Sequence, residues 1–96
     1  MPFEGYGGFS FTPASVYRNA PALPGVYGLS NANQWLYVGV ANDVQSALMA
    51  HLGERDTELA RQHPKGFTFE LCDPGFHAER RNRLVGELTP VCNRTR

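Results

Sequence analysis

Two tyrosines near the middle of this 96-residue chain stand in short triplets with glycine and valine, Gly25-Val26-Tyr27 and Tyr37-Val38-Gly39. A phenol hydroxyl both donates and accepts hydrogen bonds, and His51, further along, could exchange a proton near neutral pH. These residue types favour a site for polar or acid–base chemistry. Tyrosines on a half-buried strand also serve packing, and a histidine at a helix end often binds the last carbonyls, so both interpretations stay open.

The segment that carries the tyrosines is expected to form a β-hairpin. Two runs rich in Val, Leu, Tyr and Trp flank residues 30–34, where Ser and Asn favour a turn. A register that pairs Leu29 with Trp35 places Tyr27 opposite Tyr37. Side chains alternate along a strand, so this face presents two hydroxyls. The alternate residues are expected to point into a core: Val26, Leu36, Val38 and Val40.

The two triplets resemble those of the GIY-YIG nuclease family, and the resemblance continues along roughly three quarters of the chain. The family has a helix that ends near a histidine, matched by Asn42 to His51, and a later Pro-x-x-Asn element, matched by Pro90 to Asn93. The resemblance implies hydrolysis of a phosphodiester with one divalent cation. A glutamate on the later helix would hold the cation, an arginine on the first helix would stabilise phosphate charge, and the tyrosines would organise the attacking water.

The two charged members of that site are missing. Counting from Gly39, the arginine position is Ala47, and counting back from Pro90, the glutamate position is Arg81. Losing one group that stabilises transition-state charge typically costs on the order of a hundredfold in rate. An arginine at the glutamate position also puts positive charge where the cation must bind. Tyr27, Tyr37 and His51 are therefore expected to form an impaired or vestigial catalytic site.

No metal ligand is expected, and Glu79 is the nearest substitute. It precedes Arg81 by two positions, which on a helix is about 200° around the axis, so it faces away unless the helix is shifted.

The formal charge of the whole chain is zero, but its C-terminal end is basic. From Phe76 onward, only two acids, Glu79 and Glu87, face the arginines, which are Arg80, Arg81, Arg83, Arg94 and Arg96. Such a cluster can hold phosphates, or it can form ordinary pairs with acids four residues apart on a solvated helix face. The candidate nucleic-acid-binding residues are Arg80, Arg81, Arg83 and Asn93. Asn93 could instead hold the C-terminal turn.

Length and patterning predict one α+β domain over residues 1–96, with residues 1–8 flexible. Its sheet is expected to be small, antiparallel and three-stranded, with flanking helices. Phe9 and Phe11 alternate with polar residues like a short strand, and Thr12 should cap a helix through Asn19. The later elements are a helix capped by Asn42 or Asp43 that runs to Leu52, a short helix from Thr57, a strand over residues 67–71, and a helix over residues 76–88.

Three functions remain open at this stage. The leading hypothesis is a GIY-YIG-like domain that has lost catalysis, binds nucleic acid (DNA or RNA) and needs no cofactor. The second is an active endonuclease with displaced ligands that uses Mg or Mn. The third is a protein-interaction domain that presents aromatic residues near the N-terminus: Phe3, Tyr6 and Phe9. The chain shows no membrane-spanning run or signal peptide, so a cytoplasmic location without a membrane partner is expected.

Overall fold

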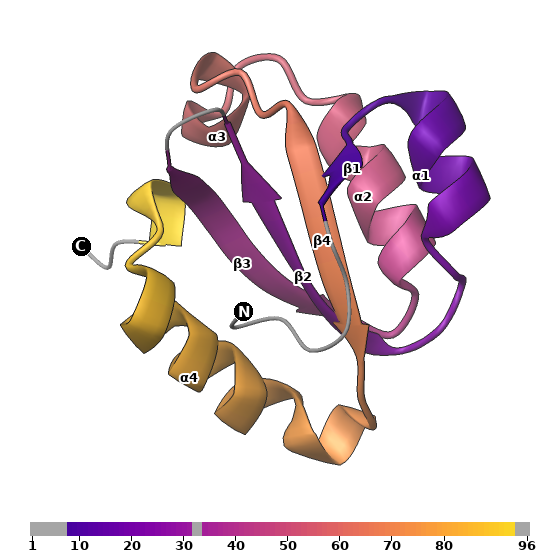
Figure 1. The fold of residues 1–96 in the computed structure, drawn as a ribbon, viewed down its shortest axis with the longest axis vertical. Helices are drawn as coiled ribbons and strands as arrows, with labels where there is room; N and C mark the ends of the chain where they lie inside the picture. The colour runs from indigo at the N-terminus through magenta and orange to yellow at the C-terminus, as the bar shows by residue number, and fades with distance from the viewer. Residues whose placement is uncertain (1–7, 32–33, 94–96) are drawn as a thin grey trace.

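The computed structural model describes residues 8–31 and 34–93. The helices pack around one sheet (Figure 1). The elements are β1 (Phe9–Ser10), α1 (Pro13–Asn19), β2 (Gly25–Ser30), β3 (Trp35–Ala41), α2 (Val44–Leu52), α3 (Glu58–Arg61), β4 (Gly66–Leu71), the 3-10 turn η1 (Pro74–Phe76), α4 (His77–Leu88) and the 3-10 turn η2 (Val91–Asn93).

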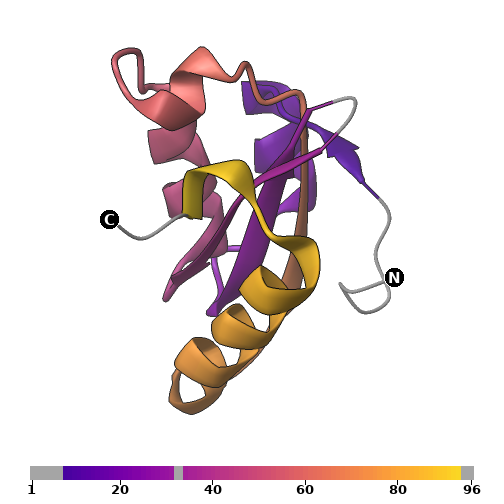
Figure 2. The same ribbon diagram turned by 90° about the vertical axis from the view of Figure 1, so that its left-hand side faces the viewer.

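The sheet is antiparallel throughout, in the order β1-β4-β2-β3. Helices α1 and α2 cover one face and α4 covers the other, as the two perpendicular views show (Figures 1 and 2). The α+β fold is confirmed. The sheet has four strands instead of the three expected, because Phe9 and Ser10 pair with the start of β4. The predicted flexible segment lies, apart from Gly8, outside the described residues.

Helices α1, α2 and α3 begin at polar residues whose side chains accept a hydrogen bond from the first turn. Thr12 Oγ1 accepts from the Ser15 N–H at 3.2 Å, and Asp43 Oδ1 accepts from the Ser46 N–H at 2.9 Å. Thr57 does the same for α3. These caps confirm the predicted helix starts, since each satisfies an amide that has no partner within the helix.

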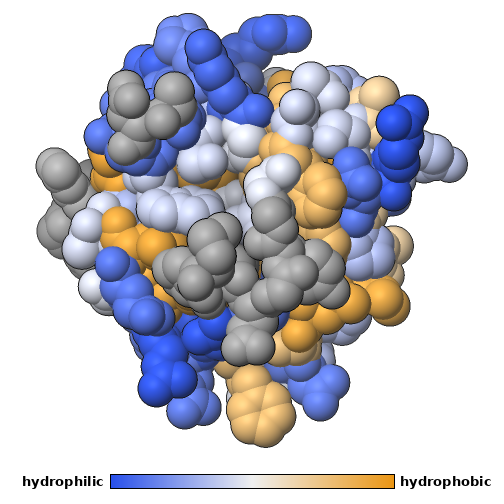
Figure 3. Space-filling model, in the orientation of Figure 1, coloured by the Kyte–Doolittle hydropathy of each residue, from blue (hydrophilic) through white to orange (hydrophobic). Residues whose placement is uncertain are grey.

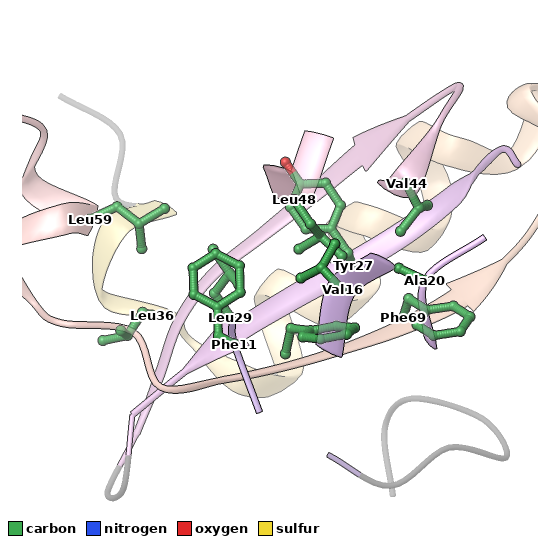
Figure 4. Packing of buried hydrophobic residues seen from close by; sticks show 11 residues of the cluster. Phe11, Val16, Ala20, Tyr27, Leu29, Leu36, Val44, Leu48, Leu59 and Phe69 are labelled. Atoms are coloured by element: carbon green, nitrogen blue, oxygen red, sulfur yellow. The ribbon is translucent and has the colours of Figure 1, made fainter. Parts of the chain in front are cut away.

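Each face of the sheet buries its own apolar cluster. Figure 4 shows the larger one, in which side chains of α1 and α2 pack on Tyr27, Leu29 and the phenylalanines of β4. On the other face, Leu84 of α4 packs on Val26 and Val38. All three of these side chains are fully buried. The two clusters hold the helices on opposite faces and so separate the tyrosine face from α4.

The register of the hairpin differs by two residues from the predicted one. Tyr27 pairs with Gly39 and Leu29 pairs with Tyr37. One residue of the shift arises at the turn, where Ser30 pairs with Trp35 and not with Gln34. The second arises from a β-bulge at Leu36, which lies between the Leu29–Tyr37 and Ser30–Trp35 pairs. Because the shift is an even number of residues, both tyrosines still share one face.

Two of the predicted core positions are also corrected. The bulge brings Leu36 into the cluster under α2, instead of the one that holds Val26 and Val38. Val40 is 37% exposed, since it lies on the edge strand outside the cluster that α4 covers. Within the described residues, none of the helices is long and apolar enough to cross a membrane.

Candidate functional site

The tyrosine face is built by β2 and β3, which bring the two phenol rings together. The ring centroids of Tyr27 and Tyr37 lie 6.1 Å apart. Gly39, opposite Tyr27, makes room for this arrangement, because a Cβ at that position would lie 2.6 Å from the Tyr27 hydroxyl and 2.7 Å from Tyr37 Cε2. Glycine is therefore required here by close approach of side chains.

The last turn of α2 adds His51 to the tyrosine pair. Its ring centroid lies 5.6 Å from that of Tyr27 and 5.4 Å from that of Tyr37. The Tyr27 hydroxyl and His51 Nε2 form a hydrogen bond of 2.8 Å. The three residues that the sequence predicted as a group, Tyr27, Tyr37 and His51, therefore do meet in space.

Glu54 extends this group, and sequence reasoning missed it. Its Oε2 lies 3.1 Å from His51 Nδ1, and its Oε1 accepts from the Thr57 hydroxyl at 3.2 Å. An ionised carboxylate can only accept, so Nδ1 carries a proton. The contact could have been predicted from Gly53, which lies between the two residues and is typical of a helix end. Gly53 ends α2, and the chain then turns so that Glu54 lies back toward His51.

The environment of Tyr27 keeps its phenol protonated. Burial raises the pKa of Tyr27 far above its ordinary value, with smaller contributions from nearby Tyr37 and Glu54. The side chain is 4% exposed, and its oxygen lies at the margin of the apolar cluster (Figure 4). Tyr27 is thus suited to hold the His51 ring in place through the hydrogen bond between its hydroxyl and Nε2. It is not suited to act as a base.

The tyrosine face opens onto a depression of about 250 Å³. Its lining contains two carboxylates and, among the described residues, no lysine or arginine; the lining residues are Tyr37, His51, Glu54, Thr57, Glu58, Leu59 and Cys92. Negative charge of this kind repels a phosphate unless a cation lies between them. We call this the tyrosine depression.

Ala47, which the sequence predicts at the arginine position of the resembled family, carries no charge. Ala47 lies on α2 one turn before His51, on the same side of the helix, and packs half-buried against the large cluster. A guanidinium at this place would lie beside the histidine. Alanine supplies only a methyl group there.

Arg81, which the sequence predicts at the glutamate position of the resembled family, lies on α4. Leu84 faces the sheet, and Arg80 and Arg81 lie on either side of it around the helix axis. Arg80 reaches β4, where its Nε and Nη2 donate to the two oxygens of Glu70 at 2.7 Å each. Arg81 is therefore turned to the other side, toward β3, and its Nη1 donates to Asn82 Oδ1 at 3.3 Å.

Glu79 is exposed, and with Arg80 and Arg83 it lines a different hollow, far around α4 from Arg81. The predicted orientation, away from the Arg81 side, agrees with this placement. In residues 8–31 and 34–93, moreover, no group of three or more His, Cys, Asp or Glu side chains could hold a metal ion. The residues present do not fit the metal site that the resemblance implies.

Asn93 connects η2 to the edge strand. Its Oδ1 accepts from the Val38 N–H at 2.6 Å, and its Nδ2 donates to the Val38 carbonyl at 2.9 Å. The amide therefore completes the ladder of β3 at one residue, the structural role that the sequence left open. That Asn93 binds nucleic acid stays a prediction.

Comparison with known proteins supports the fold. No protein-family model matches the chain and no curated protein matches it in sequence. The GIY-YIG N-terminal endonuclease domain of UvrC from Thermotoga maritima, bound to its catalytic magnesium, superposes with a TM-score of 0.70 at 19% identity, over 82% of this chain and 96% of that one. A point mutant of the same domain, bound to its catalytic divalent cation, matches with a TM-score of 0.70 at 17% identity, over 83% and 96%. The chain thus has a GIY-YIG-like fold, as the hairpin triplets indicated.

Proposed function

We propose that this chain binds nucleic acid on a GIY-YIG-like scaffold and does not cleave it by the metal-dependent route. One observation carries the proposal. Ala47 and Arg81 stand where the resembled nucleases place a guanidinium and a metal-binding carboxylate. The tyrosine face is kept, while the charges needed at a phosphodiester transition state are absent or reversed.

The distribution of charge supports α4 as the element that contacts the backbone of the nucleic acid. Arg81 and Arg83 lie on this helix, and an arginine matches the geometry of a phosphate with two parallel N–H groups. Glu54 and Glu58 line the tyrosine depression and disfavour a phosphate there. In this proposal the tyrosine face supports the fold and α4 carries the binding.

Binding measured against salt concentration tests this proposal. The affinity for a short oligonucleotide should fall steeply with salt, with a slope of about −0.7 to −0.9 on logarithmic axes for each phosphate contact. Arg81→Ala and Arg83→Ala should each weaken binding and reduce the slope by about one contact. Arg18→Ala is the matched control, because Arg18 is exposed on α1 at the opposite face of the sheet. Absence of binding at low salt, or an equal loss in the Arg18 variant, would contradict the proposal.

A second candidate, an endonuclease with displaced ligands, is favoured by one feature. The tyrosine depression holds Glu54 and Glu58 beside Tyr37 and His51, so carboxylates are present although not where the resemblance predicted them. Two carboxylates and water can hold Mg²⁺ or Mn²⁺. This candidate moves the substitute ligand from Glu79 to Glu54. It requires metal-dependent nicking that is lost in Glu54→Gln. The control is Glu87→Gln, which should leave nicking unchanged because Glu87 is an exposed acid on α4.

The protein-interaction alternative loses part of its basis. Phe9 packs on Phe67 and Phe69, with ring centroids 5.3 and 6.1 Å away, and is not an exposed anchor. Phe3 and Tyr6 lie outside the described residues.

A further inference from the structure

A second hollow, of about 230 Å³, lies at the start of α4 and shares Arg83 with the backbone contacts proposed above. It is lined by Phe76, Glu79, Arg80 and Arg83, and we call it the α4 hollow. The surrounding surface is largely hydrophilic in Figure 3, where α4 occupies the lower left of the view. An aromatic ring in such a setting differs from the scattered apolar groups of an ordinary surface.

Phe76 is the aromatic wall of the α4 hollow. It is 59% exposed and stands at the junction of η1 and α4, where its backbone N–H donates to the Asp73 carbonyl at 2.9 Å. The backbone is therefore held while the ring remains open to solvent. An exposed ring on a fixed backbone can stack on a nucleobase at little cost in conformational entropy.

Arg80 forms a wall whose position is fixed. Its bidentate bond to Glu70 on β4 joins two largely buried side chains, 19% and 15% exposed. Such paired bonds fix the plane of the guanidinium. The hollow is thus bounded by an aromatic ring and by a group held against the sheet, so it exists before any ligand binds.

Glu79 and Arg83 supply an acceptor and a donor one helical turn apart. A site for phosphate alone has no use for the Glu79 carboxylate, which repels it. A nucleobase edge does, because guanine offers the N1–H and the N2 amino group as neighbouring donors, with O6 and N7 as neighbouring acceptors. The mixed lining therefore matches a base edge better than it matches a phosphate.

We propose that the α4 hollow binds an unpaired guanine, with Phe76 stacked on its face, Glu79 accepting from its amino edge, and Arg83 donating to its carbonyl edge. The inference rests on the proposed function and deepens it. It predicts that the protein prefers single-stranded or splayed nucleic acid over a closed duplex, because a paired base can present neither its face nor its N1–H.

Fluorescence anisotropy with three labelled probes tests the inference: a short thymidine oligonucleotide, the same strand with one central guanine, and a blunt duplex of the guanine strand. The wild-type chain should bind the guanine strand more tightly than the thymidine strand. Phe76→Ala should weaken binding of the guanine strand by about 5- to 150-fold, leaving affinity for the duplex unchanged. Phe76→Tyr should keep the affinity, since it keeps the ring. Glu79→Ala removes the acceptor and should remove most of the preference for guanine over thymidine.

The outcomes separate this inference from the proposed function. Salt-dependent binding that Phe76→Ala leaves unchanged, or weakens equally on strand and duplex, overturns the guanine site and leaves the proposed function standing. Absence of binding to all three probes at low salt overturns both. Because Phe76 is exposed, its variants should fold, and circular dichroism checks that they do.

Discussion

The tyrosine face and α4 lie on opposite sides of one sheet and hold their polar groups in different ways. Around the tyrosines, polar groups form a chain of hydrogen bonds from Tyr27 through His51 and Glu54 to Thr57, next to the large apolar cluster. On α4, guanidinium groups lie on the helix surface, and one is anchored to the sheet by Glu70. The tyrosines are part of the packing, so changing them costs stability. On α4, Arg83 is exposed and contributes little packing, so changing it should cost less stability.

Asn93 links the edge strand to the segment that follows α4, and its loss should have the largest effect on stability. Asn93→Ala would leave the N–H and the carbonyl of Val38 without these partners. The free energy of unfolding should fall by about 3 kcal/mol, measured by chemical denaturation. Asn82→Ala is the matched control, because Asn82 is exposed and its Oδ1 accepts a long hydrogen bond, of 3.3 Å, from Arg81. Equal losses in the two variants would refute the structural role of Asn93.

Gly39→Ala tests the close packing of the tyrosine face. The added Cβ would overlap the Tyr27 hydroxyl and Tyr37, so one ring must move, at a cost of about 2 kcal/mol in the free energy of unfolding. Gly86→Ala, on α4, provides the contrast. Apart from the neighbouring residues and backbone of α4 itself, no atom of the described residues lies within 4 Å of the added carbon, and alanine should stabilise that helix by about 0.8 kcal/mol. If both substitutions act in the same direction, the two regions do not differ in packing as described.

Tyr27→Phe removes the hydrogen bond to His51 and should cost about 1 kcal/mol near neutral pH. Because burial raises the pKa of Tyr27, the unfolded chain loses this proton at lower pH than the folded chain. The difference in free energy of unfolding between wild type and Tyr27→Phe should be constant below about pH 10, the ordinary pKa of tyrosine. Above it, the advantage should shrink by up to about 1.4 kcal/mol per pH unit.

Chemical denaturation of wild type and Tyr27→Phe, at pH values below and above about 10, measures the difference between their free energies of unfolding. Titration of the other groups is common to both proteins and cancels in this difference. A difference that grows above pH 10 would mean that Tyr27 is ionised more easily in the folded chain. Nucleic-acid affinity should be the same in wild type and in Tyr27→Phe, since the proposed contacts lie on α4.

Thr89→Gly should have a modest effect, and a favourable one. Thr89 ends α4 in the left-handed region, with φ 44° and ψ 59°, and its N–H donates to the Val85 carbonyl. Glycine adopts this conformation without the penalty of a β-branched side chain, so the melting temperature should rise, for a gain of about 1 kcal/mol. Thr89→Ala keeps a Cβ at positive φ and should gain less. An equal gain in both variants would show that backbone strain is not the cause.

Local chemistry in the sequence predicted most of the elements. Three helices are capped by side chains next to them in the sequence, those of Thr12, Asp43 and Thr57. The alternation of residues 67–71 predicted β4. Both signals depend only on near neighbours in the chain, so the sequence alone reveals them. The predicted hairpin register was wrong by one residue at the turn and by a second at Leu36, where the bulge depends on which cluster buries that side chain.

The polar contacts of the site were harder to predict. The sequence grouped Tyr27, Tyr37 and His51 through a known pattern, whereas Glu54 comes back to His51 only through the turn that ends α2. Arg80 was expected to face solvent or phosphate, yet it pairs with Glu70, ten positions away on another element. Pairings of this kind depend on how α4 crosses the sheet, which no local rule determines.

The most direct test of the account is a nicking assay on supercoiled plasmid, with Mg²⁺ or Mn²⁺ and enough protein to saturate binding. The account predicts a salt-sensitive complex and no metal-dependent nicking, because Ala47 and Arg81 supply neither the guanidinium nor the metal-binding carboxylate of the nucleases it resembles. Nicking that requires the metal and disappears in both Tyr37→Phe and Glu54→Gln would contradict it.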